Sequence, residues 1–327
     1  MLHDKFGRTI DYLRLSVTDR CDFRCVYCMA EDMTFLPRAQ VLTLEEAAEI
    51  CRAFTELGVS KIRITGGEPL VRKNVLHLFN SIGKLPGLQE LNLTTNGSHL
   101  AAMAGDLRRA GVTRINVSLD TLDSAQFTEL TRFGKLPDVL AGIAAAKNAG
   151  FERIKLNTVV LKQRNLDQVA ALVEFALREQ LDISFIEEMP LGAITEHGRE
   201  QEFCSSAEIR TQLSQYYSLQ ASSEKTGGPS RYWTVAGHPS RIGFISPHSE
   251  NFCSSCNRVR VTAEGRLLLC LGNENSVDLK AVIRRYPGDR DKLKSVIVAA
   301  IVHKPEKHHF YQDDGEQIVR FMNTTGG

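Results

Sequence analysis

The residues best suited to chemistry are three cysteines on one short stretch near the start of the chain: Cys21, Cys25 and Cys28, spaced C-x3-C-x2-C. Thiolates held this close together bind zinc or iron–sulfur groups. Three ligands are one fewer than a closed zinc site or a fully ligated [4Fe-4S] cluster requires. The spacing therefore favours a [4Fe-4S] cluster with one iron open to a ligand from outside the protein. The alternatives are a zinc site completed by a distant His or Cys and a chance group of buried thiols.

A second group of three cysteines lies near the other end of the chain: Cys253, Cys256 and Cys270. The sequence after Cys256 predicts a β-hairpin with strands at residues 258–262 and 266–270. The central turn puts Cys270 opposite Arg258 and beside Cys256, so the three sulfurs can meet. The pattern predicts a second metal site, again with three thiolates.

Two arginines accompany this second group. Arg258 and Arg260 are two residues apart, so on a strand they share one face. A zinc ion with His248 or Cys204 as its fourth ligand is the alternative to an iron–sulfur cluster here. Taken by themselves, Cys204 and Cys51 are expected to be ordinary buried residues.

Short strand-like runs alternate with helix-like runs through the first part of the chain. Strands are expected at 12–17, 61–65, 90–94, 114–119, 153–160 and 183–187, and helices at 44–57, 76–85, 101–110, 138–149 and 166–179. This alternation is typical of βαβ units and a parallel sheet. Because six units are too few for a closed eight-stranded barrel, we predict an α/β fold: an open, partial TIM-type barrel of about six βα units. A doubly wound sheet is the alternative.

The βα alternation stops at about residue 195. Glycine- and proline-rich turns then separate short extended pieces. We therefore expect a boundary near 195–205, with the partial barrel in residues 1–200. Residues 201–327 are expected to form an α+β lid that carries the second metal site and closes the open side of the barrel.

Composition narrows the class of protein. The formal net charge of +1 gives no overall field to attract nucleic acid or an anionic membrane. No signal peptide and no membrane-spanning apolar run is recognisable. Eight cysteines without an export signal favour metal ligands over disulfides. We expect a cytoplasmic metalloprotein, and the sequence leaves monomer and homodimer open.

Several motifs together resemble one known family. They are the two cysteine groups, Gly66-Gly67-Glu68-Pro69-Leu70, Phe252-Cys253-Ser254-Ser255-Cys256-Asn257-Arg258-Val259-Arg260 and the terminal Met322-Asn323-Thr324-Thr325-Gly326-Gly327. The first cysteine loop resembles the signature of the radical S-adenosylmethionine (SAM) superfamily. The whole set resembles the GTP 3′,8-cyclases within it. Ala30 departs from the family, which often has proline there.

The resemblance implies a role for each residue of the first site. Cys21, Cys25 and Cys28 would hold a [4Fe-4S] cluster that binds SAM. Four residues would contact SAM: Tyr27, Gly67, Ser118 and Met189. Without the resemblance, Gly67 would be a tight strand-to-helix turn, Ser118 a polar residue at a strand end and Met189 a core residue.

The resemblance also implies six GTP contacts: Arg14, Arg63, Thr94, Lys155, Arg258 and Arg260. Five of the six are cationic, which suits a triphosphate. Five converging cations in a chain of net charge +1 require an anionic ligand to offset their repulsion. No Walker A motif is present, so the chain is not a P-loop GTPase.

For the second cysteine group, the resemblance implies another [4Fe-4S] cluster, on Cys253, Cys256 and Cys270, whose open iron anchors the guanine ring. It also implies that Gly326 and Gly327 enter the active site beside the arginines. A frayed tail is the alternative for these two glycines.

The implied reaction is radical SAM chemistry that converts GTP to (8S)-3′,8-cyclo-7,8-dihydroguanosine 5′-triphosphate and cleaves SAM to 5′-deoxyadenosine and methionine. It opens molybdenum cofactor biosynthesis. The implied partners are a flavodoxin-type reductase as electron donor and cyclic pyranopterin monophosphate synthase as the next enzyme. Two alternatives remain: a radical SAM enzyme that acts on a peptide, and a non-enzymatic zinc or electron-transfer protein.

Overall fold

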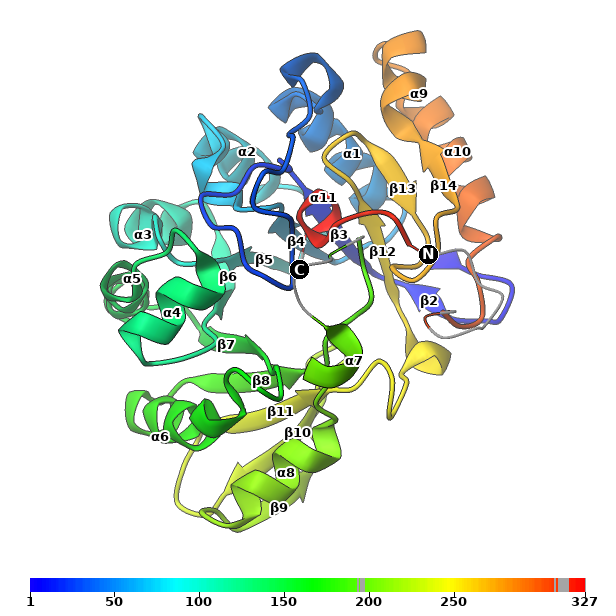
Figure 1. Ribbon diagram of the computed structural model, residues 1–327. Helices are drawn as coiled ribbons and strands as arrows, with labels where there is room; N and C mark the ends of the chain where they lie inside the picture. The colour runs from blue at the N-terminus through cyan, green and yellow to red at the C-terminus, as the bar shows by residue number, and fades with distance from the viewer. Residues whose placement is uncertain (193, 195–197, 309, 311–317, 327) are drawn as a thin grey trace.

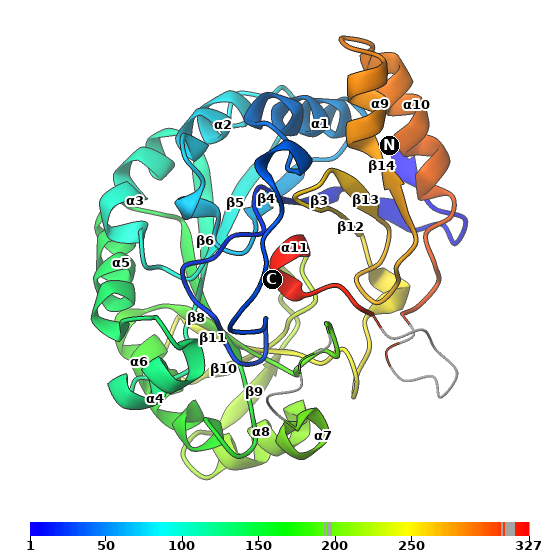
Figure 2. The same ribbon diagram turned by 45° about the horizontal axis from the view of Figure 1, so that its top comes forward.

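A computed structural model describes residues 1–192, 194, 198–308, 310 and 318–326. Its main sheet has twelve strands in the order β14-β13-β12-β3-β4-β5-β6-β7-β8-β11-β10-β9. A separate two-stranded pair is formed by β1 (Leu2–His3) and β2 (Thr9–Ile10). Figures 1 and 2 show the large sheet curving around a central space, with helices along its outer side.

The six predicted strands are confirmed. They are β3 (Tyr12–Ser16), β4 (Lys61–Thr65), β5 (Glu90–Thr95), β6 (Val112–Ser118), β7 (Arg153–Val159) and β8 (Asp182–Ile186). Each pairs in parallel with the next one along the chain. This order is what successive βα units produce, because each helix returns the chain to the starting edge.

The C-terminal region, predicted as an α+β lid, adds strands to the sheet itself. Two of its strands, β11 (Arg241–Ile245) and β12 (Arg258–Val261), pair in parallel with β8 and β3 at the two ends of the predicted sheet. The parallel part therefore has eight strands rather than six. Antiparallel strands continue it on both sides: β10 (Arg231–Val235), β9 (Leu219–Ser222), β13 (Arg266–Leu268) and β14 (Ser276–Asp278).

The barrel is open. Strands β14 and β9 end the ladder on its two sides, and in the described part of the chain they do not pair with each other. The prediction of a partial TIM-type barrel is thus confirmed, with more strands than the sequence indicated.

Helices cover the outer face of the sheet (Figure 2). Those of the βα units are α1 (Leu44–Glu56), α2 (Val75–Ile82), α3 (Leu100–Arg109), α4 (Ser124–Thr131), α5 (Leu136–Asn148) and α6 (Val169–Glu179). The remaining helices are α7 (Arg199–Glu202), α8 (Ser206–Ser214), α9 (Leu279–Arg285), α10 (Arg290–Ile301) and α11 (Met322–Thr325), of which α11 lies on the inner side of the sheet. Short 3-10 turns occur at Arg38–Gln40, Pro69–Val71, Leu166–Gln168 and Cys253–Ser255.

Local sequence explains where these helices begin. Thr43 and Glu46 form the reciprocal capping box expected at the start of α1. Helix α4 is not among the predicted helices, although Asp123 caps it by accepting a hydrogen bond from the backbone N–H of Gln126. None of the described helices combines the length and the apolar character needed to cross a lipid bilayer.

Side chains along each strand point alternately to the outer face of the sheet, where the core lies, and to the inner face, where the site lies. On β3, Leu13 and Leu15 are fully buried in the main apolar cluster between sheet and helices, whereas Arg14 between them points to the other face. The same alternation on β4 buries Ile62 and Ile64 around Arg63. The outer face of the sheet thus holds the core, and the inner face is free to carry charged side chains.

Candidate active site

One cavity on the inner side of the sheet contains both cysteine groups. Its volume is about 300 Å³, and all six of these cysteines line it. Ten further residues singled out from the sequence line the same cavity: Arg14, Tyr27, Arg63, Gly67, Thr94, Ser118, Lys155, Met189, Arg258 and Arg260. The two motifs therefore share one chamber rather than lying on separate surfaces.

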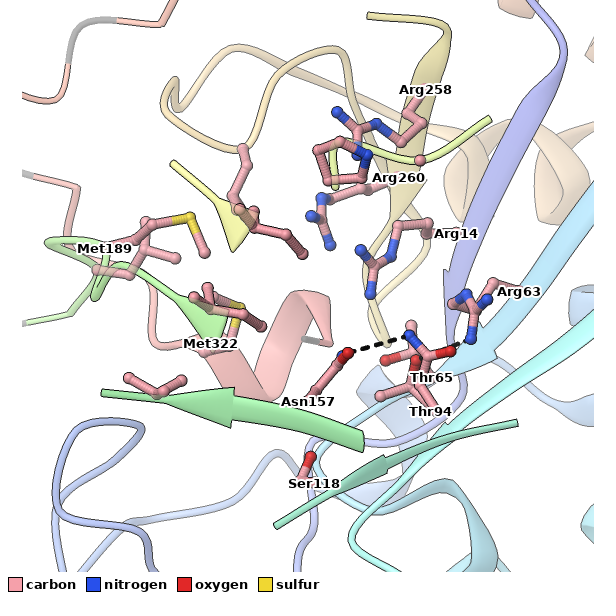
Figure 3. Close-up of a pocket in the computed structure, with 18 of the residues that line it drawn as sticks. Arg14, Arg63, Thr65, Thr94, Ser118, Asn157, Met189, Arg258, Arg260 and Met322 are labelled. Carbon is pink, nitrogen blue, oxygen red and sulfur yellow. Dashed lines mark hydrogen bonds between the residues drawn. The ribbon is translucent and has the colours of Figure 1, made fainter. Parts of the chain in front are cut away.

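Three arginines stand in a row across neighbouring parallel strands. Arg260 on β12 lies opposite Arg14 on β3, and Arg14 lies opposite Arg63 on β4. Adjacent strands are about 4.8 Å apart and paired residues share a face, so these cationic side chains are close neighbours. Figure 3 shows Arg14, Arg258 and Arg260 on one side of the cavity and Met189 on the other. Like charges this close repel, so the arrangement favours an anionic ligand.

The pKa values of two arginines in this row agree with a site for an anionic ligand. Burial lowers the pKa of Arg14 to about 10; Tyr12 acts to raise it, and the charges of Arg63 and Arg258 add to the decrease. Burial, followed by the charges of Arg14 and Arg258, holds the pKa of Arg260 well below its usual value. A bound anion would act against both decreases, because it stabilises the charged guanidinium.

Arg63 is fixed by three hydrogen bonds. Its Nε donates to the Tyr12 hydroxyl at 2.6 Å, and its Nη1 donates to the carbonyl of Leu93 at 2.8 Å and to the Thr94 hydroxyl at 3.3 Å. Burial acts to raise the pKa of Tyr12, but the charges of Arg63 and Arg14 outweigh it and bring the pKa to about 8. Arg63 and Thr94 thus form one preorganised part of the cavity wall.

Lys155 approaches the cavity from β7. Thr94, Asn116 and Lys155 are successive partners across β5, β6 and β7. Burial lowers the pKa of Lys155, and its ammonium lies 5.9 Å from the centre of the Tyr232 ring. The cation set therefore extends from β12 across the sheet to β7.

The first cysteine loop follows β3. Burial raises the pKa of all three thiols, to about 12 for Cys28. Thiols in this environment stay protonated unless a positively charged metal group stabilises the thiolates. Three thiols on one loop beside a cavity fit a cluster with one open coordination position.

Tyr27 is held against the cavity wall by a buried carboxyl group. Its hydroxyl donates to Oδ2 of Asp120 at 2.7 Å, and the backbone N–H of Val159 donates to Oδ1 at 2.9 Å. Burial raises the pKa of Asp120 to about 6 despite these two hydrogen bonds. The orientation of the Tyr27 ring is thus set by β6 and β7.

The turn after β4 packs tightly against the chain just before Cys21. A Cβ on Gly67 would lie 2.5 Å from the carbonyl oxygen of Arg20, so a side chain does not fit there. The next residue, Glu68, accepts hydrogen bonds from the backbone of Leu70 and Asn96 and from the Thr95 hydroxyl. Burial raises the pKa of Glu68 to about 7. This turn fixes the ends of β4 and β5 beside the first thiols.

The hairpin predicted for the second group is confirmed. Arg260 pairs with Leu268 and Val261 with Leu267, and the same register continued puts Cys270 opposite Arg258. Burial acts to raise the pKa of the Cys256 thiol, but the charges of Arg258 and Lys304 outweigh it and bring the pKa to about 7. For Cys270, burial outweighs the charge of Lys304 and the pKa is raised.

The C-terminal helix α11 lies inside the curve of the sheet (Figure 2). The Nη1 of Arg260 donates to the carbonyl of Gly326 at 2.8 Å. The side-chain amide of Asn323 donates to the carbonyl of Asp19 at 2.8 Å, near the first cysteine loop. The structure therefore places Gly326 beside Arg260, and Gly327 lies outside the described residues.

Comparison with known proteins identifies the family. The chain is 61% identical over 326 residues to the GTP 3′,8-cyclase of Saccharophagus degradans, covering 100% of this chain and 98% of that protein. It is 60% identical over 326 residues, with the same coverage, to the GTP 3′,8-cyclase of Ectopseudomonas mendocina. This chain belongs to the GTP 3′,8-cyclase family.

Two family patterns agree with a GTP 3′,8-cyclase, and a solved structure shares the fold. The radical SAM superfamily pattern matches residues 15–176, and the pattern named Molybdenum Cofactor Synthesis C matches residues 181–310. The structure of Streptococcus suis SuiB bound to S-adenosylmethionine is similar, with a TM-score of 0.63, 17% identity and coverage of 88% of this chain and 68% of that chain. At this identity the likeness is one of fold.

Some cavity-lining residues of this GTP 3′,8-cyclase family member were given no role from the sequence: Asn96, Asp120, Asn157, Lys304, His308, Met322 and Asn323. The first three follow or end predicted strands, where polar residues carry a recognisable signal. Lys304 follows a helix, and its sequence neighbourhood gives no sign of the cavity. Only the tertiary fold brings it there.

The zinc alternative finds no prepared site. Within the described ranges, no three His, Cys, Asp or Glu side chains converge closely enough for a single metal ion. The suggested fourth ligands, Cys204 and His248, are not among the residues that line the cavity. His248 instead contacts the Glu188 carbonyl through Nε2 at 2.8 Å.

Proposed function

We propose that this chain is a radical SAM GTP 3′,8-cyclase. It converts GTP to (8S)-3′,8-cyclo-7,8-dihydroguanosine 5′-triphosphate, cleaves SAM to 5′-deoxyadenosine and methionine, and opens molybdenum cofactor biosynthesis. The observation that carries the proposal is the shared chamber, because both cysteine groups and all five cationic side chains predicted to bind GTP line one cavity. Full-length identity of about 60% to curated GTP 3′,8-cyclases supports the same conclusion.

The first thiol group is the proposed place of radical generation. Cys21, Cys25 and Cys28 would hold a [4Fe-4S] cluster, and their single loop and cavity position fit it. When bound, the cluster and SAM supply a 5′-deoxyadenosyl radical that takes the hydrogen atom from C3′ of GTP. Four residues would bind and orient SAM: Tyr27, Gly67, Ser118 and Met189.

Gly67 and Tyr27 are suited to this task for different reasons. Gly67 lets the turn after β4 pack directly against the backbone of Asp19 and Arg20, because a Cβ there would collide with it, and this fixes the turn that SAM would contact. Tyr27 cannot rotate freely because its hydroxyl is bonded to Asp120. Both features reduce the ordering that SAM binding would otherwise require.

The arginine row is the proposed triphosphate site. Arg14, Arg63, Arg258 and Arg260 would bind phosphate oxygens from one side, with Thr94 and Lys155 completing the contacts. Guanidinium groups form paired hydrogen bonds with phosphate, and a buried setting strengthens each bond. These residues would position the substrate. They would hold C3′ and C8 of GTP at a fixed distance from the radical source while the walls of the cavity exclude water.

Cys253, Cys256 and Cys270 would hold a second [4Fe-4S] cluster, which would supply an open iron for the guanine ring. The lowered pKa of Cys256 and the nearby cations fit an anionic metal–thiolate group. Gly326 would close the substrate side of the chamber through its hydrogen bond to Arg260, together with Gly327.

The proposal extends to partners. A flavodoxin-type reductase would deliver electrons, and cyclic pyranopterin monophosphate synthase would consume the product. An enzyme that uses GTP and carries oxygen-sensitive clusters suits the cytoplasm. The proposed active form is either a monomer or a homodimer. A peptide substrate, the alternative for another radical SAM enzyme, would leave the row of arginines without its anionic ligand.

One experiment tests the function directly. Anaerobically reconstituted protein is incubated with SAM, dithionite and GTP, and the products are analysed by mass spectrometry. We expect 5′-deoxyadenosine, methionine and a cyclised nucleotide that is an isomer of GTP, so it is recognised by its chromatographic retention and its fragmentation pattern rather than by its mass. Cleavage of SAM that does not respond to GTP and gives no new nucleotide would contradict the proposal.

A further inference from the structure

Lys304 is a buried lysine that the mechanism above does not use. Only 2% of its surface is exposed, and it lines the cavity. It lies just after α10, where its backbone N–H donates to the carbonyl of Ile301. Its long side chain then runs into the second cysteine group.

The ammonium group of Lys304 contacts the backbone beside two of the three cysteines. Its Nζ donates to the carbonyl of Arg258 at 2.9 Å and to the carbonyl of Leu269 at 2.5 Å. Arg258 is two residues after Cys256, and Leu269 immediately precedes Cys270. The lysine thus joins the two strands of the hairpin at the end where the thiols meet.

The residues next to Lys304 reach the third cysteine. Arg8 donates to the carbonyls of Pro305 and Glu306, and the same guanidinium donates to the carbonyl of Cys253 at 2.8 Å. Its Nε is bound by the buried carboxylate of Asp4 at 2.5 Å. The segment 304–306 is therefore tied to the backbone at or beside every cysteine of the second group.

Arg8 and Lys304 differ in whether a carboxylate forms an ion pair with them. Arg8 has a carboxylate partner in Asp4. In the part of the chain that the structure describes, no carboxylate forms an ion pair with Lys304. A buried ammonium without a counter-charge is costly. Its ammonium instead lies against the backbone near Cys256 and Cys270.

We propose that Lys304 is a positioning residue of the second metal centre and its fixed counter-cation, so that its charge sets the reduction potential of the group held by Cys253, Cys256 and Cys270. This inference rests on the proposed function, which supplies the second [4Fe-4S] cluster. Three thiolates on such a cluster give a net negative charge, and one-electron reduction adds another. A fixed positive charge favours the reduced form and raises the potential.

The test isolates the second centre. Cys25→Ala in every variant disables the first cluster, so that the remaining iron–sulfur signal belongs to the second. Lys304→Gln keeps a hydrogen-bond donor but removes the charge, whereas Lys304→Arg keeps the charge. Lys280→Met is the matched control, because Lys280 also donates to a backbone carbonyl, that of Gln40, and does not line the cavity. The measurements are iron content, thermal midpoint and a potentiometric titration followed by electron paramagnetic resonance.

We expect Lys304→Gln to shift the midpoint potential to a more negative value, Lys304→Arg to stay near the parent and Lys280→Met to match it. Equal potentials in Lys304→Gln and the parent, or equal shifts in the Gln and Arg variants, would overturn the charge role. Should Lys304→Gln fold poorly, retention of the parent potential by Lys304→Arg supports the proposal, and a shift in that variant overturns it. A parent with no iron–sulfur signal would overturn the second cluster itself, and the inference with it.

Discussion

Arg260 on β12 lies directly opposite Arg14 on β3, so that a residue from the end of the chain and one from its start form adjacent positions of one parallel ladder. The pair continues to Arg63 on β4. A sheet seldom places like charges side by side, since each pair is destabilising without a counter-ion. The most direct explanation is that the fold is completed by an anionic ligand.

Removing Arg260 tests this explanation. We expect Arg260→Ala to weaken GTP binding about 10- to 100-fold, because a hydrogen bond to a charged group contributes about 1.5–3 kcal/mol. Isothermal titration calorimetry measures the change. Arg266→Ala is the control, since Arg266 bonds to Ser276 on the hairpin's exposed side and does not line the cavity. Equal GTP affinity in the Arg260 variant and the control would contradict the triphosphate site.

Substituting a cysteine of the first thiol group should have a different effect from substituting a lone cysteine. We expect Cys25→Ala to lose about half of the iron of the reconstituted protein and all SAM cleavage, because the cluster loses one of its three protein ligands. Cys51→Ala removes a thiol that is fully buried in α1 and should retain both. Iron analysis and chromatography of 5′-deoxyadenosine measure the two effects. Normal iron content in Cys25→Ala would refute the assignment.

Tyr12 offers a pH-dependent test of the cation cluster. The charges of Arg63 and Arg14 lower its pKa from 10.0 to about 8 in the folded protein. A group with a depressed pKa adds stability above its unfolded pKa and loses it as pH falls through the folded pKa. Relative to Tyr12→Phe, the nucleotide-free protein should therefore gain stability as pH rises from about 8 to 10.

The measurement is a tyrosinate absorbance titration of the two proteins, paired with thermal midpoints at each pH. Added GTP should raise the pKa of Tyr12 again, because phosphate offsets the arginine charges. A difference spectrum that titrates at the ordinary tyrosine pKa in the absence of GTP would argue against the cluster.

The role of Gly326 in the site can be tested by comparing it with another glycine of similar φ. It has φ of +71°, and a Cβ there would collide with the side chain of Thr65. We expect Gly326→Ala to slow product formation at least 10-fold while iron content stays unchanged. Gly288→Ala carries a similar φ of +78° but has open space around it, so it controls for backbone strain. The amount of cyclised nucleotide, separated from GTP by liquid chromatography, distinguishes the two variants. Similar losses in both would contradict a role for the tail in the site.

Local sequence determined much of this protein. The spacing of Cys21, Cys25 and Cys28 indicated the first metal site, and the residues between Cys256 and Cys270 gave the hairpin and its register. The six strands of the βα units were also predictable, because hydrophobic periodicity and helix caps are short-range signals. Family resemblance then gave the roles.

Only the tertiary structure decided how distant segments meet. Strands β11 and β12 add to β8 and β3 through long-range pairing, which leaves no periodic trace in either segment. The row Arg260–Arg14–Arg63 and the approach of Lys304 to both strands of the hairpin follow from that pairing. Sequence fixes which face of a strand a residue occupies, because alternation is local. The neighbour across the ladder depends on which strands the whole chain brings together.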